Sequence, residues 1–166
     1  IVPMVNSAAQ AEQAVASVYY PPRGRRGVGL ARAQGYGSNF EGYREWLPRE
    51  AVVIVQVEHI QAVENLAEIL AVEGVDGFFV GPYDLSSSLG IPAQWAHVRM
   101  TEAMARIREV GGASGKAPGI HVIEPDPEAA RQKVAEGYRL IAYSLDIRLL
   151  DHTCRQGLEA IGSLNK

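Results

Sequence analysis

The sequence predicts a parallel α/β fold, and three observations lead to that prediction. Residues 52–57 form a β-branched run, VVIVQV, that is too apolar for a half-exposed strand and is typical of a parallel strand buried on both faces. An amphipathic stretch over residues 60–70 follows, and then a second apolar segment at 75–80. The same alternation continues to the end of the chain. Strands that alternate with helices in this way form a parallel sheet with crossover helices.

The elements can be assigned in order from apolar periodicity and from capping residues. Strands are expected at residues 1–5, 52–58, 75–84, 118–123 and 140–146. Helices are expected at residues 8–19, 60–70, 96–110, 127–136 and 147–164, with a short helical turn at 86–90. Ser7 and Asp126 are the expected N-caps of two of these helices, and Gly111-Gly112 is the expected end of a third.

Residues 20–50 are expected to form a long loop, because they show no strand periodicity and are rich in Gly, Arg and Tyr. Long loops in compact domains are usually lids, interfaces or binding loops. We therefore interpret this segment as an active-site or interface loop, in which Arg25, Arg26 and Arg32 could meet an anionic substrate or a neighbouring subunit.

The composition predicts one soluble α/β domain over residues 1–166, with 47% hydrophobic and 21% charged residues. The net charge of −3 leaves no basic footprint for nucleic acid, and no apolar run reaches the roughly 20 residues of a membrane span. The single cysteine, Cys154, excludes an internal disulfide and favours a reducing cytoplasm.

Glu58 and Asp84 are the candidate metal ligands. Each follows a buried apolar strand, and a right-handed crossover places the carboxyl ends of both strands at the same edge of the sheet. Two carboxylates there would repel each other unless a proton or a cation lay between them, and Mg²⁺ is typically held by one or two carboxylates. The simpler alternative is that each acid only caps the helix that follows it.

Four sequence blocks resemble the HpcH/HpaI family of metal-dependent (class II) 2-oxo-acid aldolases. The blocks are VQVEH around Glu58, EGVDGFFVGPYDLS around Asp84, and the segments 19–37 and 115–122. The resemblance implies a (β/α)₈ TIM-barrel type of fold, of which this chain would hold about the last five βα units. A complete barrel takes about 250 residues. We therefore expect the chain to be the C-terminal part of a longer polypeptide or to pair with one that supplies the other strands.

The resemblance also implies roles for individual residues. Glu58 and Asp84 match the family's metal ligands, for Mg²⁺, Mn²⁺ or Co²⁺. Gln56 matches a glutamine beside the metal, and the turn Gly81, Pro82, Tyr83 and Asp84 matches the one whose backbone holds the pyruvate carboxylate. The implied reaction joins or cleaves pyruvate and an aldehyde through a pyruvate enolate. No catalytic base is identified, because the family's base lies on the early strands, and the isolated chain should be nearly inert.

The remaining lysines and histidines have plainer interpretations. Lys116, Lys133 and Lys166 are all misplaced for a Schiff base, which favours a metal as the Lewis acid. His121 is expected to be a hydrogen-bonded histidine of a strand. The other three histidines, at positions 59, 97 and 152, are expected at the surface or at helix caps.

Two alternative functions stay open. One is an acyl-CoA or citramalyl-type lyase of the same barrel superfamily, and the other is a non-catalytic fragment or metabolite-binding module. In the resembled family a C-terminal helix packs on a neighbouring subunit, so residues 147–166 predict a homo-oligomer.

Overall fold

The computed structural model describes residues 1–163, and its centre is a parallel sheet whose four strands lie in chain order. The strands are β1 (Ile54–Val57), β2 (Gly77–Val80), β3 (Ala117–Val122) and β4 (Leu140–Tyr143). All three neighbouring pairs are parallel, which confirms the predicted parallel α/β fold.

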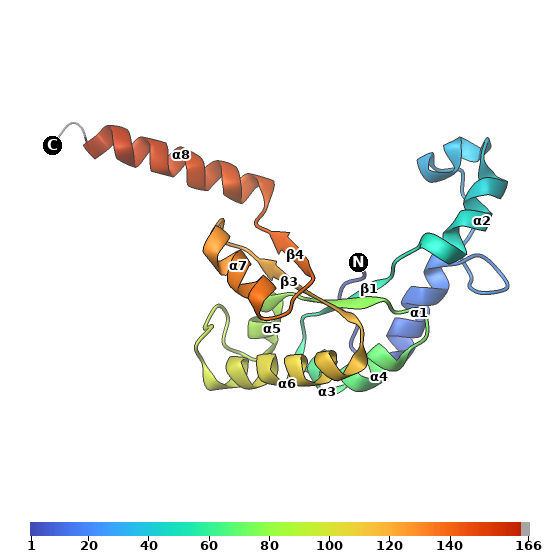
Figure 1. Ribbon diagram of the computed structural model, residues 1–166, viewed down its shortest axis with the longest axis horizontal. Coiled ribbons are helices and arrows are strands. Elements are labelled where there is room, and N and C mark those ends of the chain that lie inside the picture. The colour runs from blue at the N-terminus through green and yellow to red at the C-terminus, as the bar shows by residue number, and fades with distance from the viewer. Residues whose placement is uncertain (164–166) are drawn as a thin grey trace.

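Helices connect the strands and cover one face of the sheet. They are α1 (Ala8–Val18), the 3-10 helix η1 (Arg32–Gly37), α2 (Phe40–Glu50), α3 (Ile60–Glu64), α4 (Leu66–Ala71), α5 (Pro82–Ser88), α6 (Val98–Ser114), α7 (Pro127–Ala135) and α8 (Asp146–Ser163). In Figure 1, α3, α4 and α6 lie along the same face of the sheet, while α2 and α8 extend from opposite ends of the molecule. None of the helices in the described part of the chain has the length and apolar character needed to cross a bilayer.

The core lies between the sheet and these helices. Val55, Val57, Phe78 and Val80 alternate along β1 and β2, and all four side chains are at most 1% exposed in a cluster that also contains residues of α4 and α6. Side chains alternate across a strand, so the residues between them, including Gln56, belong to the other face. This alternation determines which side chains can form a site on the face that the helices do not cover.

Three of the predicted strand boundaries were wrong. Residues 1–5 form only one bridge, between Val2 and Val55, because Pro3 lacks an N–H group and Met4 has a positive φ of 54°. β4 ends at Tyr143 rather than Asp146, because Ser144 adopts a φ of 56°. β2 ends at Val80, and Asp84 lies in the first turn of α5.

Two helix predictions also needed correction. Gly111 does not end α6, which continues to Ser114 and closes at Gly115 with a φ of 69°. Gly111 instead lies against β2, where an added Cβ would overlap the Phe78 ring. The single helix expected over residues 60–70 is divided at Asn65, whose side-chain amide donates a hydrogen bond to the Asn6 carbonyl (2.8 Å). The caps at Ser7 and Asp126 are confirmed.

Residues 20–50 are more ordered than a loop, because they contain η1 and α2. Leu47 on α2 is buried with Tyr20 and Val53, and Phe40 and Tyr43 pack against them in a second small core. Arg26 donates to the Tyr43 hydroxyl (2.9 Å), so this arginine stabilises the segment itself. The predicted open loop was therefore wrong, while a role of the segment at the active site or an interface stays a prediction.

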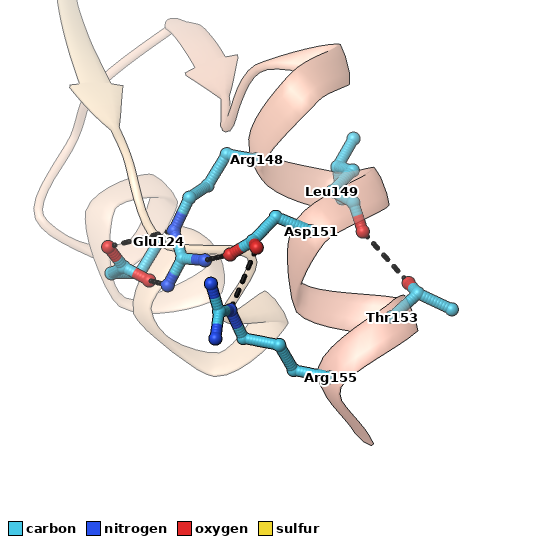
Figure 2. Close-up of polar contacts among 6 residues, drawn as sticks. All are labelled: Glu124, Arg148, Leu149, Asp151, Thr153 and Arg155. Carbon is cyan, nitrogen blue, oxygen red and sulfur yellow. Dashed lines mark hydrogen bonds and ion pairs between the residues drawn. The ribbon is translucent and has the colours of Figure 1, made fainter. Parts of the chain in front are cut away.

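An ion-pair chain attaches the beginning of α8 to the end of β3 (Figure 2). Arg148 donates to Glu124 (2.6 Å) and to Asp151 (2.7 Å), and Arg155 donates to the other oxygen of Asp151 (2.8 Å). The hydrogen bond that Arg148 donates to the Glu124 carboxylate raises the pKa of Arg148. Beyond this attachment α8 has no buried residue up to position 162.

Candidate metal centre

Glu58 is a buried carboxylate at the carboxyl end of β1, with an exposed fraction of only 5%. One of its oxygens, Oε1, accepts a hydrogen bond from the Met4 backbone N–H (2.8 Å), and Oε2 accepts one from the Gln56 side-chain amide (2.6 Å). Both donors are neutral, and no arginine, lysine or histidine of residues 1–163 forms an ion pair with Glu58. Burial of an ionised carboxylate is costly unless a cation compensates its charge.

Gly81 packs closely against this carboxylate. A Cβ at this position would lie 2.9 Å from Glu58 Oε2 and 3.1 Å from Gln56 Nε2, so any larger residue would displace the two side chains. Gly81 pairs with β1 through its N–H, which donates to the Val57 carbonyl (3.2 Å). The glycine therefore brings the chain after β2 directly against Glu58.

Asp84 follows three residues later, in the first turn of α5. Its side chain is exposed, and within the described residues it has no hydrogen-bond or ion-pair partner. Pro82 occupies the first position of the helix, where its missing N–H is not needed. The prediction that Asp84 ends a strand was wrong, but the turn at Gly81 and Pro82 still places Asp84 in the segment that packs on Glu58.

The donor set fits a hard divalent cation. Mg²⁺ prefers carboxylate oxygens and keeps several waters, so two carboxylates are a sufficient protein contribution. No group of three or more histidine, cysteine or acidic side chains within residues 1–163 is arranged to hold a metal. The burial of the Glu58 carboxylate with only neutral donors as partners, and the close approach that Gly81 allows, are the two observations that favour a cation at this place.

The structure brings the predicted metal ligand Glu58 together with two of the predicted substrate residues, Gln56 and Gly81. The Gly81 N–H is already used by Val57, and Pro82 has none, so only Tyr83 and Asp84 have backbone N–H groups in a first helical turn, where no intrahelical acceptor exists. The Tyr83 side chain lies away from this turn and contacts Trp95 edge to face, with ring centroids 4.8 Å apart.

The contact between Met4 and Glu58 was not predicted from the sequence. Its backbone N–H reaches Glu58 only because Met4 adopts a left-handed φ of 54°, which is uncommon for a residue with a side chain. Backbone donors leave no signal in the residue types. The one available hint was Pro3, which interrupts the predicted first strand next to it.

The remaining predicted residues are accounted for structurally. His121 bonds the Ser144 carbonyl through Nε2 (3.2 Å), as expected for a histidine of a strand. His59 and His97 are N-caps of α3 and α6. Lys116 donates to the Val75 carbonyl (2.6 Å) near the amino end of β2, and Lys133 pairs with Glu136 (2.8 Å) on α7. Lys166 lies outside the described residues.

Comparison with known proteins identifies relatives along nearly the whole chain. The family model described as HpcH/HpaI aldolase/citrate lyase matches residues 1–153. A 2-keto-3-deoxy-L-rhamnonate aldolase of Escherichia coli K12 is 41% identical over 161 residues, which cover 95% of this chain and 59% of the relative. The chain thus spans about three fifths of the length of this curated relative.

Solved structures of this family share the fold. An HpcH/HpaI aldolase/citrate lyase family protein of Burkholderia cenocepacia J2315 superimposes with a TM-score of 0.87 at 38% identity, over 96% of this chain and 63% of the other. A more distant neighbour, the citrate lyase beta subunit of Mycobacterium tuberculosis, was solved with oxaloacetate and magnesium. It has a TM-score of 0.54 at 19% identity, over 86% of this chain and 54% of its own, and this likeness shows the fold alone. The four strands and their crossovers are part of a TIM-barrel-like fold.

Proposed function

Since this chain belongs to the HpcH/HpaI aldolase/citrate lyase family, we propose that the protein is a divalent-metal-dependent aldolase that acts on 2-oxo acids. In the cleavage direction such an enzyme breaks a carbon–carbon bond of the 2-oxo acid and releases pyruvate and an aldehyde. The observation that supports the proposal most directly is the buried Glu58 carboxylate, which has only neutral donors as partners and is approached closely by the backbone of Gly81.

Glu58 and Asp84 would hold the cation, and the cation would supply Lewis-acid polarisation of the keto oxygen. The Gln56 amide and the Met4 N–H each donate to Glu58 and hold its two oxygens in place. The backbone N–H groups of Tyr83 and Asp84 would bind the substrate carboxylate, because the first turn of a helix has no internal acceptors for them. Gly81 would keep room for the substrate, since its Cβ position points at Glu58 Oε2.

Thermal melting with and without Mg²⁺ or Mn²⁺ tests the metal site. We expect the cation to raise the melting temperature of the native chain by roughly 5 to 10 °C at about 100 times its Kd. Glu58→Gln and Asp84→Asn should each remove this rise, whereas the exposed Glu64→Gln on α3 should retain it. An equal metal-induced rise in all four proteins would contradict the proposal.

Pyruvate release tests the reaction itself. The first substrate to assay is 2-keto-3-deoxy-L-rhamnonate, for which the E. coli relative is named. We expect the 166-residue chain to be slower than the full-length E. coli relative by roughly 10² to 10⁴-fold, because it has no identified base for proton transfer. The matched control is the relative shortened to the 161 aligned residues, which should lose activity to a similar extent. No loss on shortening would refute the assignment of the base to other parts of the enzyme.

We further propose that α8 packs on a second subunit and that the enzyme is a cytoplasmic homo-oligomer. Ile147, Leu150, Leu158 and Ile161 on α8 are each more than 60% exposed. Light scattering would test this proposal. Leu158→Glu should shift the native assembly to smaller species, whereas Glu159→Gln on the same turn should not, and identical masses for both variants would argue against it.

A further inference from the structure

A cleft of about 460 Å³ is lined by residues of α5, α6, β3 and α7. Its floor includes Met100 and Met104 of α6, and its rim is the Tyr83 and Trp95 pair. Methionine side chains adapt to irregular apolar surfaces, and aromatic rims hold flat groups. Glu58 does not line this cleft, but Pro82 and Tyr83 do, so the cleft adjoins the turn of the candidate metal centre.

The charge that the cleft offers to a ligand is positive, because its other charged side chains already form ion pairs within the protein. Glu124 lines the cleft, but its carboxylate is taken up by Arg148 (2.6 Å), as Figure 2 shows. Lys133 also lines it and is paired with Glu136 (2.8 Å). Arg108 lies between this cleft and a second hollow beside Tyr138, and it has no hydrogen-bond or ion-pair partner among residues 1–163, so its guanidinium remains available to a ligand.

The size of the cleft also fits a ligand. Pockets for small molecules usually measure about 300 to 1,000 Å³ and combine mostly apolar walls with a few placed polar groups. The α7 helix has no buried residue and contributes Ala129 and Lys133 to the wall of the cleft.

We propose that this cleft binds a small organic anion with a flat apolar body and one carboxylate or phosphate group. The Arg108 guanidinium binds the acid group, because planar guanidinium matches both oxyanions in two-pronged hydrogen bonds. The apolar body lies on Met100 and Met104 beneath the aromatic rim. This site shares Pro82 and Tyr83 with the candidate substrate turn, but binding through Arg108 requires no metal at Glu58.

The three methionines make the proposal testable by NMR of ¹³C-methyl-labelled methionine. Met100 and Met104 line the cleft, whereas the backbone N–H of Met4 contacts Glu58. Titration with 1-naphthylacetate should shift the signals of Met100 and Met104 with a Kd on the order of 10⁻⁴ M and leave Met4 unchanged. The phosphate analogue, 1-naphthyl phosphate, shows which acid group the site prefers, and the uncharged 1-naphthaleneethanol measures the apolar part alone.

Variants on α6 then test the role of the charge. Arg108→Gln should weaken the binding of the acid about tenfold and leave the neutral alcohol within about twofold. Arg106→Gln is the matched control, because Arg106 is exposed on the same helix and pairs with Glu109 (3.0 Å) away from the cleft. Equal shifts of all three methionines, no saturable shift, or equal weakening by both arginine variants would overturn the proposal. Mg²⁺ instead should perturb Met4 first, so that failure of one site is distinguishable from failure of the other.

Discussion

The two halves of the sheet differ sharply in how well they are covered. All four residues of β2 are buried, and β1 alternates between buried and half-buried positions, with α3, α4 and α6 packed over one face of both strands. At the other end, β4 has no buried residue, and neither has α7. The half with the covered strands contains the candidate metal centre, and the half with the open surfaces contains the cleft and the exposed α8.

This difference indicates that the tightly packed part of the molecule and its exposed surfaces lie in different halves of the sheet. Glu58 is positioned by backbone and side-chain donors on a tightly packed strand, as a metal ligand must be. The surfaces around α7 and α8 have few internal contacts and are available to other molecules. Three predictions test whether residues of the two halves also differ in their contribution to the free energy of unfolding.

The largest effect is expected for a matched pair of valines. Val80 on β2 is 0% exposed and Val134 on α7 is 61% exposed. Val80→Ala should lower the free energy of unfolding by about 2 to 3 kcal/mol through lost burial and a cavity, whereas Val134→Ala should change it by less than about 0.5 kcal/mol. Urea denaturation measures both. Equal losses would mean that the two halves are equally well packed.

A smaller effect is expected for the neighbouring glycines of α6. Gly111→Ala should destabilise by about 1 to 3 kcal/mol because its methyl group would overlap Phe78, whereas Gly112→Ala meets nothing within 4 Å and should stabilise the helix by about 0.5 to 1 kcal/mol. In a Phe78→Ala background the cost of Gly111→Ala should disappear. If that cost persists, the contact between α6 and β2 does not explain the glycine.

The smallest effect concerns Tyr138, which follows α7 and is 5% exposed with no partner for its hydroxyl among the described residues. Tyr138→Phe should change the free energy of unfolding by no more than about 1 kcal/mol, and toward greater stability, because it removes an unpaired buried hydroxyl. Chemical denaturation at neutral pH measures this change. A clear destabilisation would reveal a partner for the hydroxyl.

The same variant has a pH signature. Burial raises the pKa of the Tyr138 phenol above its ordinary value of 10.0, although the charge of Arg108 opposes this. Because the phenol has a higher pKa in the folded state than in the unfolded state, its full contribution to stability is present below the unfolded-state pKa. That contribution is lost as the pH rises through the folded-state pKa. Between about pH 9 and 11 the native chain should therefore lose more stability than Tyr138→Phe. Parallel pH profiles would contradict the shift.

Much of the fold could be predicted from local pattern. The β-branched run at 52–57 and the alternation after it predicted the parallel sheet, and the family suggested by the four sequence blocks is confirmed. The α2 helix was missed because Gly42 and Pro48 obscure the helical spacing of Phe40, Tyr43 and Leu47. The role of Gly111 was wrongly predicted, because a glycine is needed there for close contact with Phe78, which is distant in sequence. The spacing of residues along the chain cannot reveal such a contact.

The side chains of the candidate site could be predicted from the sequence, but its backbone contacts could not. The residue types and the crossover topology singled out Glu58 and Asp84, and Gly81 could be expected to allow a close approach. The start of α5 was also readable, because Pro82 after Gly81 is typical of a helix N-terminus. The donation from Met4 depends on a left-handed backbone conformation, which no residue type at that position specifies.

The most direct test of the metal centre is a count of bound Mn²⁺ by electron paramagnetic resonance of the free ion. The native chain and Glu64→Gln should each bind one Mn²⁺ per chain that Mg²⁺ displaces. Glu58→Gln and Asp84→Asn should each leave the ion free at the same concentrations. Binding that survives both substitutions, or no binding to the native chain, would contradict a cation held by Glu58 and Asp84.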